Sequence, residues 1–369
     1  MVNPIMVFKV ITFVNGLPSI FLQRSRHYDE PQPAKGKTAK DGDSSMSSFR
    51  ESLKKENFSE WARTIIMSSW RDSTKLQYES YIKKWEKFTA EREIDFATPS
   101  VRDIIEFLTD IFNTGVGYSA INTARSALST FISIQGFTAG NHPLVKRFAK
   151  GAFNLRPALP RNLVTWDTNL VLKYITTLAP VRRIGLKDLT LKLTIMLALL
   201  SGQRCQTLHL IRIPNITLTQ NSVKIRITDL LKQTRPGHHL QEISIKAYAP
   251  DRRLCIVTVL QEYIKRTATL RRNDNLFISY VPPHKQVSKA TIGRWIKYVL
   301  TKSGVDVSIF TPHSTRAAAT TGAKLMNVPI ATIIKTAGWS NETTFSKYYD
   351  KTPGKEVDFA HALLQRTQK

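Results

Sequence analysis

The sequence predicts a two-domain, mainly helical protein whose second domain also contains a small β-hairpin. Apolar residues recur with helical spacing across residues 56–150, which indicates a first, all-helical domain. Prolines interrupt the pattern around residues 156–161, and strict apolar–polar alternation at 223–228 and 242–246 then indicates two paired strands. A length of 369 residues, 42% of them apolar, is sufficient for two hydrophobic cores and a tail.

Residues 1–55 are predicted to form a disordered or poorly structured extension. The apolar run Met6–Val14 is interrupted by Lys9, is too short to span a bilayer and is not followed by a small-residue cleavage site. We therefore expect neither a secretory signal nor a membrane anchor. From about residue 23 onwards, prolines, glycines and a serine cluster give the composition of a disordered linker.

The first domain, residues 56–150, is predicted to be a bundle of four or five short helices. Ser73 is expected to cap one helix, and Ser100 and Asp103 have the spacing of a capping box at the start of the next. A third helix is expected from about Ser119. The helix after Ser73 carries one apolar stripe, formed by Tyr78, Tyr81, Ile82, Trp85 and Phe88.

A linker at residues 151–165 is predicted to separate this bundle from a second domain at residues 166–369. Asp167 is a candidate N-cap for the first helix of the second domain. The stretch Leu186–Leu200 is apolar on nearly every face, which is typical of a central buried helix. The hairpin follows, and further helices are expected at residues 253–270, 289–300, 312–326, 329–337 and 342–349.

The charge balance indicates a polyanionic partner. The chain has 54 Lys and Arg residues against 28 Asp and Glu residues, a formal net charge of +26. The basic residues are spread through the predicted folded regions, so we favour nucleic acid over a merely basic, very soluble protein. The two cysteines, Cys205 and Cys255, provide neither a disulfide framework nor metal-ligand spacing, and they fit a reducing compartment such as the cytosol or nucleus.

Several side chains scattered through the second domain suit phosphodiester chemistry. His313 and Arg316, three residues apart, lie on one face of a predicted helix, and Arg204 stands at the start of another. Two guanidiniums can hold a phosphate, and a tyrosine from the segment 345–349 can attack it. Each residue alone has a simpler explanation: a surface arginine, a solvated loop lysine at Lys232, a core histidine, or a packing tryptophan at Trp339.

Cofactor-dependent chemistry finds no support in the sequence. His238 and His239 have no neighbouring carboxylates, no carboxylate cluster suggests a Mg²⁺ site, and no glycine-rich phosphate-binding loop precedes a helix. We therefore expect no metal and no nucleotide. An enzyme that transfers DNA strands without a metal and without a nucleotide has to conserve the energy of the broken bond in a covalent intermediate, which a tyrosine can form.

The ordered set Arg204, Lys232, His313-x-x-Arg316, Trp339 and a terminal tyrosine resembles the tyrosine recombinase (phage integrase) family. The resemblance covers about residues 57–365. It implies a helical SAM-like core-binding domain and an α+β catalytic domain of the DNA breaking-rejoining, or integrase-like, fold. More narrowly, the chain resembles recombinases of DIRS-group retrotransposons in animal genomes, through the segments Tyr118-Ser119, Arg125–Ser129, Gln233–Gly237, Pro312–Ala317, Ala337–Ser340 and Thr344–Tyr349.

The resemblance assigns a role to each of these residues. Arg204 and Arg316 would clamp the non-bridging oxygens of the scissile phosphate, and Lys232 would protonate the departing 5′-oxygen. His313 would accept the tyrosine proton or hydrogen-bond the phosphate. Trp339 would donate its indole N–H or brace the site, and the tyrosine would form a 3′-phosphotyrosine linkage.

Two features of the family pattern remain open in this sequence. Counting from Trp339 as in bacterial members gives Tyr348 as the nucleophile, whereas the DIRS-group pattern gives Tyr349, which we prefer because Asp350-Lys351 follows it. Many members have an acidic residue three positions after the first arginine, but this chain has Thr207 there. Support for Arg204 or His313 is therefore expected from another residue.

The resemblance implies a site-specific DNA recombinase or integrase of mobile-element origin that acts in the nucleus. The implied partner is double-stranded DNA, bound by a homotetramer with a dimer on each site, without a membrane or a small-molecule substrate. The alternative is a domesticated, catalytically inactive DNA-binding protein, which the N-terminal extension and Thr207 favour. The sequence indicates neither the target DNA sequence nor whether integration or excision is the biological step.

Overall fold

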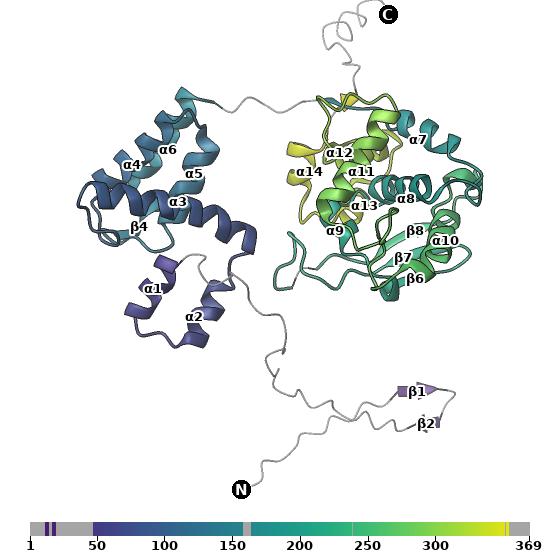
Figure 1. Ribbon diagram of the computed structural model, residues 1–369, viewed down its shortest axis with the longest axis horizontal. Coiled ribbons are helices and arrows are strands. Elements are labelled where there is room, and N and C mark those ends of the chain that lie inside the picture. Colours follow the sequence, from purple (N-terminus) through teal and green to yellow (C-terminus); the bar gives the residue numbers. More distant parts are fainter. Residues whose placement is uncertain are drawn as a thin grey trace, which may run out of the picture. The chain divides into compact units, whose positions relative to one another are not determined.

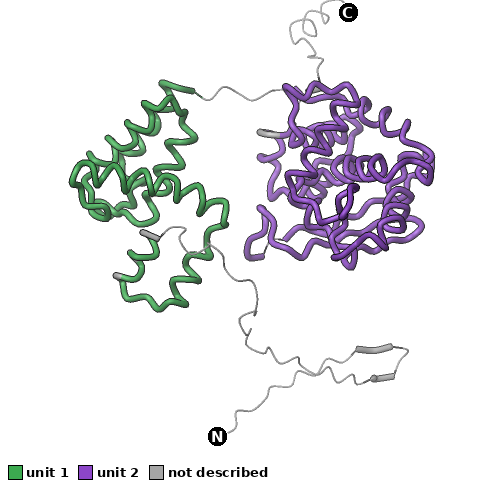
Figure 2. The backbone as a smooth tube through the Cα atoms, in the orientation of Figure 1, with its two compact units in different colours: residues 1–159 green, residues 160–369 purple. Residues whose placement is uncertain are grey.

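The computed structural model describes residues 47–157, 164–237 and 239–350, together with the backbone of three short strands. The side chains of residues 47, 48, 52, 55, 347 and 348 lie outside this description. The chain divides into two compact units, residues 1–159 and residues 160–369 (Figure 2). Most of the expected N-terminal extension lies outside the described residues, apart from the backbone of the hairpin formed by β1 (Thr12–Val14) and β2 (Leu17–Ser19).

Unit 1 is a helical bundle (Figure 1). Its first helix, α1, lies within residues that we expected to be poorly structured, and its last, α6, continues past residue 150, where the linker was predicted to begin. The helices and the two short paired strands are α1 (Ser47–Lys55), α2 (Glu60–Met67), α3 (Asp72–Glu91), α4 (Val101–Asn113), α5 (Tyr118–Leu128), β3 (Ser133–Ile134), β4 (Phe137–Thr138) and α6 (Pro143–Leu155).

The first residues of α4 and α3 differ in how the helix start is capped. At α4 the capping box is present: the Ser100 side chain accepts from the Asp103 backbone N–H, and the Asp103 carboxylate accepts from the Ser100 N–H. At α3 the expected cap at Ser73 is wrong. The helix begins at Asp72, and Arg71, with extended backbone and no side-chain cap, is its N-cap residue.

The core of unit 1 is built around Trp85, which is fully buried. Its indole N–H donates to the Phe96 carbonyl oxygen at 3.0 Å, so the polar edge of the ring is satisfied. The ring stacks on Phe88 at a centroid distance of 5.5 Å and meets the edge of Phe107 at 5.1 Å. Of the predicted stripe on α3, Ile82, Trp85 and Phe88 are buried, whereas Tyr78 and Tyr81 are half-buried.

Unit 2 is arranged around α8, as the apolar stretch predicted. This helix packs against α10, α11 and α12, and most of its residues are buried (Figure 1). The helices are α7 (Thr168–Thr177), α8 (Leu186–Ser201), α9 (Cys205–His209), α10 (Ile256–Thr267), α11 (Lys289–Lys302), α12 (Ser314–Leu325), α13 (Ile330–Ala337) and α14 (Glu342–Tyr348). Asp167 caps α7 as expected, since its side chain accepts from the Asn169 N–H.

The predicted hairpin is part of a three-stranded antiparallel sheet in the order β6-β7-β8. Strands β7 (Ser222–Ile225) and β8 (Ile243–Lys246) are the predicted pair, and β6 (Ile216–Leu218) was missed because its three residues are too few to show alternation. Between β7 and β8, residues 226–242 form a long connection.

The first and last strands of unit 2 lie side by side. Strand β5 (Val164–Thr165) pairs in parallel with β9 (Thr352–Pro353). Directly after β5, the Trp166 indole N–H donates to the Ser314 hydroxyl at 2.9 Å. The beginning of unit 2 is therefore bonded both to the start of α12 and to the strand that follows α14.

A lysine inside the core of unit 2 satisfies the end of a helix. Lys192 on α8 is fully buried, and its Nζ donates to the carbonyl oxygens of Ile175 at 2.8 Å and Leu178 at 2.7 Å, at the C-terminal end of α7. These carbonyls have no partner within the helix. Burial lowers the pKa of Lys192 from 10.5 to about 8, although the nearby Asp251 carboxylate opposes the shift.

We expect Lys192 to make stability depend on pH in the alkaline range. Between pH 8 and 10.5 the unfolded chain keeps a proton that the folded chain has lost, so the free energy of unfolding rises with pH in this window and is flat below it. The full rise is about 3 kcal/mol. Denaturant unfolding of the wild type and Lys192→Met checks this, because the difference between them isolates the Lys192 contribution. Lys297→Met, on the exposed face of α11, should give a constant difference from the wild type.

Candidate active site

The position of Arg204 is set by the backbone between two helices of unit 2. Helix α8 ends at Ser201, and Gly202 follows in the left-handed conformation with φ of 58°, which reverses the chain direction. Arg204 then has extended backbone and is the N-cap residue of α9. Its Nη1 donates to the Gln233 Oε1 at 3.2 Å. This contact supplies support for Arg204 in a chain that has Thr207 at the usual acidic position.

Arg316 lies in the first turn of α12 and is 2% exposed. Its Nη1 donates to the Gly202 carbonyl oxygen at 2.8 Å, and its Nη2 donates to the Ala337 carbonyl oxygen at 2.7 Å. These oxygens lie at the C-terminal ends of α8 and α13, where helix carbonyls lack partners and carry partial negative charge. One guanidinium therefore joins three helices, while its Nε has no partner.

The Arg316 guanidinium is an unusually strained cation. Its pKa is lowered to about 9, mainly by burial and in part by the positive charge of Arg204, whereas Tyr349 opposes the shift. Neither arginine forms an ion pair with a carboxylate among the described residues. Two repelling guanidiniums that lack a counter-charge form a site in which an anion is favoured.

Tyr349 is placed against His313, Trp339 and Arg316. Its hydroxyl lies 3.3 Å from the His313 Nε2, and its ring centroid lies 4.6 Å from that of Trp339. The Arg316 guanidinium lies 4.4 Å from the Trp339 ring centroid and 5.4 Å from that of Tyr349. A cation so close to two aromatic faces is stabilised by the ring quadrupoles.

The backbone of Tyr349 is held from two sides. As the C-cap residue of α14 it donates its N–H to the Phe345 carbonyl oxygen at 2.8 Å, and its own carbonyl accepts from the Thr321 hydroxyl at 2.9 Å. Phe345 and Tyr349 both contact Trp339, so the prediction that they share a face is confirmed. Tyr348 belongs to α14, but its side chain lies outside the described residues.

Three predicted residues line one small cavity. Arg204, His313 and Arg316 face a space of about 170 Å³ that is enclosed on most sides. Three N–H donors on Arg316 and on neighbours of the two arginines are buried without partners. They are the Nε of Arg316, which lines the cavity, the indole Nε1 of Trp339, whose ring contacts Arg316, and the Nε2 of Gln233, whose Oε1 is bonded to Arg204. Buried donors of this kind are costly when unpaired, and an oxyanion is the ligand that satisfies them.

Lys232 is the predicted residue that the structure does not bring into this cluster. Its side chain is exposed on the connection between β7 and β8, and no hydrogen bond or ion pair joins it to Arg204, His313 or Arg316 in the described structure.

Sequence reasoning also missed two glutamines. Besides Gln233, Gln203 is buried, where its Nε2 donates to the Thr336 carbonyl oxygen at 2.7 Å and its Oε1 accepts from the Thr207 hydroxyl at 3.3 Å. Both stand next to predicted site residues, and this adjacency was the available signal.

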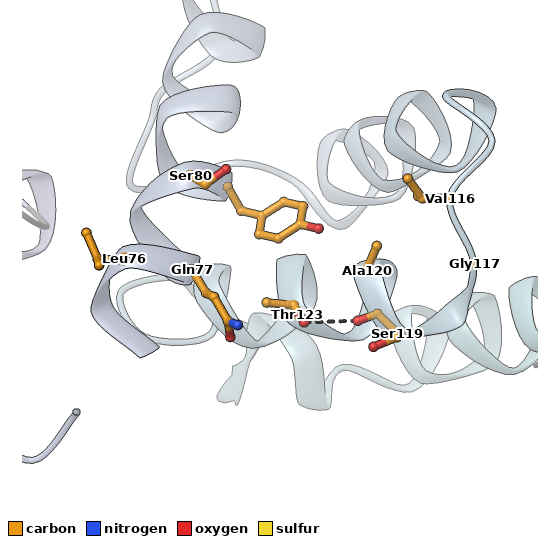
Figure 3. A pocket seen from close by; sticks show the side chains of 9 residues that line it. Leu76, Gln77, Ser80, Val116, Gly117, Ser119, Ala120 and Thr123 are labelled. Atoms are coloured by element: carbon orange, nitrogen blue, oxygen red, sulfur yellow. Dashed lines mark hydrogen bonds between the residues drawn. The ribbon is translucent and has the colours of Figure 1, made fainter. Parts of the chain in front are cut away.

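A larger hollow lies in unit 1, between α3 and α5 (Figure 3). Its volume is about 680 Å³, and it is widely open. The hollow is lined by Leu76, Gln77, Ser80, Tyr81, Val116, Gly117, Ser119, Ala120 and Thr123. This lining contains neither a lysine nor an arginine, so it lacks the positive charges that bind phosphate. The cavity at Arg204 is therefore the better candidate for an anion.

Residues 172–355 match the family described as Phage integrase family. No curated protein matches the chain. Among solved structures, the chain is similar to the XerH site-specific recombinase bound to palindromic difH substrate in a post-cleavage complex, with 15% identity, 79% of this chain and 80% of that chain covered, and a TM-score of 0.55.

Two further structures have the same fold. The Tn1549 transposon integrase in complex with transposon right end DNA is 15% identical, with 87% of this chain and 99% of that chain covered and a TM-score of 0.54. The lambda integrase dimer bound to a COC′ core site is 18% identical, with 85% and 79% covered and a TM-score of 0.50. Residues 172–355 thus match the phage integrase family, and the chain has the integrase-like catalytic fold of these recombinase structures, mostly helical with small sheets.

The described residues contain neither a metal-binding cluster nor a membrane-spanning helix. No group of three or more His, Cys, Asp or Glu side chains is placed to hold a metal ion there. No described helix is long and apolar enough to cross a membrane.

Two left-handed glycines beside the site differ in the space around them. A Cβ at Gly338 would lie 2.6 Å from the Leu240 Cδ1 and 3.2 Å from the Gln233 Nε2, whereas a Cβ at Gly202 would make ordinary contacts. We expect Gly202→Ala to lower the free energy of unfolding by about 1 kcal/mol through backbone strain alone. Gly338→Ala should cost about 2 kcal/mol because overpacking is added. Denaturant unfolding measures both, and equal losses would contradict the crowding at Gly338.

Proposed function

We propose that this protein is a tyrosine-type site-specific DNA recombinase that cleaves and rejoins DNA through a 3′-phosphotyrosine intermediate. The observation that carries the proposal is the convergence of Arg204, His313 and Arg316 on one cavity, with the Tyr349 hydroxyl hydrogen-bonded to His313. The integrase-like fold supports it independently.

The proposed reaction exchanges one phosphodiester for another. The Tyr349 oxygen attacks the scissile phosphorus while His313 accepts its proton, and the bond from phosphorus to the 5′-oxygen breaks. Lys232, whose exposed side chain has to swing towards the phosphate, protonates the departing 5′-oxygen. A 5′-hydroxyl of a partner strand later attacks the phosphotyrosine and releases Tyr349 unchanged, so the bond energy is conserved without a cofactor.

The cations and buried donors stabilise the transition state of this reaction. Arg204 and Arg316 clamp the non-bridging oxygens, on which negative charge accumulates. Because Arg316 is fixed by two helix ends, it needs little reorganisation when the charge develops. The Trp339 indole N–H is a further donor beside the same guanidinium. Tyr349 is the proposed nucleophile because its hydroxyl contacts His313.

The proposed partner is double-stranded DNA, bound by a homotetramer with a dimer on each site. The charge of +26 favours a polyanion, and the similar XerH recombinase, Tn1549 integrase and lambda integrase were solved with DNA, the last as a dimer on a core site. We also propose that the protein derives from a mobile element related to DIRS-group retrotransposons and that it acts in the nucleus. Both proposals rest on the sequence motifs.

A covalent adduct tests the nucleophile. The purified protein is incubated with a randomised pool of nicked duplexes, in which cleavage near the nick releases a short fragment and traps the adduct, and adducts that survive denaturing gels are sequenced. We expect the wild type and Tyr348→Phe to form adducts. Tyr349→Phe should lose them by at least about a thousandfold, because its ring still packs on Trp339 but it has no hydroxyl.

Two other results are informative. An adduct lost in Tyr348→Phe and kept in Tyr349→Phe would reverse the assignment. Absence of any adduct with the wild type, together with tight DNA binding, would favour the inactive DNA-binding protein.

Salt dependence tests the electrostatic contribution to binding. Affinity for a labelled duplex should fall roughly a thousandfold between 50 and 200 mM salt if about six phosphates are neutralised. Arg204→Ala should reduce the slope of log affinity against log salt by about one. Arg253→Ala is the matched control, because Arg253 is already paired with Asp251 at 2.9 Å and should leave the slope unchanged. A flat wild-type response would contradict a phosphate-binding site.

A further inference from the structure

The residues around Lys232 form a closed turn. The Thr234 N–H donates to the Leu231 carbonyl oxygen at 2.9 Å, and the Leu231 N–H donates to the Thr234 hydroxyl at 2.9 Å. Leu231 is 1% exposed, so the turn is anchored in the core at its first residue. The backbone around Lys232 is therefore a compact unit, and its position relative to the cavity determines what the lysine side chain can reach.

The Gln233 side chain connects this turn to the cavity. Its Oε1 accepts from the Arg204 Nη1 at 3.2 Å, and Arg204 lines the cavity. The other anchors of the connection lie away from the cavity: the Arg226 N–H donates to the Asn215 carbonyl oxygen, and Asp229 pairs with Arg212 at 2.9 Å.

The two partners of this hydrogen bond are not equally constrained. The Arg204 backbone stands between buried Gln203 and helix α9, at the end of the central helix. Gln233 belongs to the connection between β7 and β8, whose described residues form no named strand. Breaking the bond therefore releases the turn more than it releases Arg204.

The chain also leaves space for the glutamine. Its Nε2 is buried and lies within 3.2 Å of where a Cβ on Gly338 would be, beside Trp339. A side chain at position 338 would push the amide away from Arg204. The left-handed glycine that ends α13 thus allows the turn to approach the site.

We propose that Gln233 is a positioning residue, which holds the Lys232 turn in register with Arg204 so that the lysine side chain reaches the leaving 5′-oxygen. The inference rests on the proposed function, because it presupposes that Lys232 is the general acid. It predicts that loss of Gln233 impairs protonation of the leaving group, not attack by the tyrosine.

The chemistry allows these two effects to be separated. In an ordinary substrate the bond from phosphorus to the 5′-oxygen breaks, and the proton passes from the Lys232 ammonium to that oxygen. If sulfur replaces the bridging 5′-oxygen, the bond from phosphorus to sulfur breaks and a thiolate leaves. A thiol has a pKa of only about 8.5, so the thiolate leaves without a proton and Lys232 keeps its own.

The experiment compares the duplex captured by the wild type in ordinary and 5′-bridging phosphorothiolate forms. Gln233→Met keeps the length of the side chain and removes the acceptor for Arg204. We expect it to cleave the ordinary duplex at least tenfold more slowly than the wild type and the sulfur duplex within about threefold. Lys232→Ala should show the same pattern with a larger loss. Gln241→Ala, an exposed glutamine of the same connection, should match the wild type on both duplexes.

Each other outcome counts against a specific step. Equal losses on both duplexes in Gln233→Met, with an unchanged unfolding midpoint, would place the effect on Arg204 or the tyrosine and overturn the inference. Wild-type rates on the ordinary duplex would overturn it as well. If Lys232→Ala were not rescued by sulfur, the general acid assigned in the proposed function would be wrong. A wild type that cleaves neither duplex would remove the function and the inference together.

Discussion

The Arg316 guanidinium is the interaction on which the arrangement of the site depends. Its two hydrogen bonds hold the ends of α8 and α13 against the start of α12, and each of these ends carries a site residue or leads directly to one. A buried cation is expensive, and here helix-end carbonyls offset part of that cost in place of a carboxylate. A carboxylate would have neutralised the charge. The carbonyls leave most of it available to a phosphate.

The N–H donors beside the two arginines also lack hydrogen-bond partners. The indole N–H of Trp339, whose ring contacts Arg316, and the amide N–H of Gln233, whose oxygen is bonded to Arg204, are buried without partners. A fully paired cluster would be more stable as a free protein but would gain less from an anion. The site is therefore organised for a ligand, in agreement with a function that requires charge stabilisation in the transition state.

Much of the fold could be predicted from the sequence where the signal is local and strong. The Ser100 capping box, the Asp167 cap and the apolar α8 all rest on residues within one or two turns of each other. The short strand β6 and the exact start of α3 could not be predicted, because three residues carry no periodicity and several polar residues compete as caps. Within the site, residue types and order predicted the arginines, His313 and a tyrosine, and the structure brings Arg204, His313, Arg316 and Tyr349 close together.

Other contacts of the site are tertiary and leave no signal in the sequence pattern. The Tyr349 hydroxyl contacts His313, and Arg204 is bonded to Gln233, which lies 29 positions away along the chain. No spacing rule relates such residues. The exposure of Lys232 could not be predicted from the sequence pattern either, because a lysine is equally hydrophilic in a site and on an exposed loop.

The pairing of β5 with β9 joins parts of the chain that are far apart in the sequence. Residues 164–166 directly follow the segment that connects the two units, and they are bonded to the strand just beyond Tyr349 and, through Trp166, to the residue beside His313. One short segment, residues 164–166, is therefore bonded both to the strand that follows Tyr349 and to the neighbour of His313. It holds the backbone close to both partners of the tyrosine–histidine hydrogen bond.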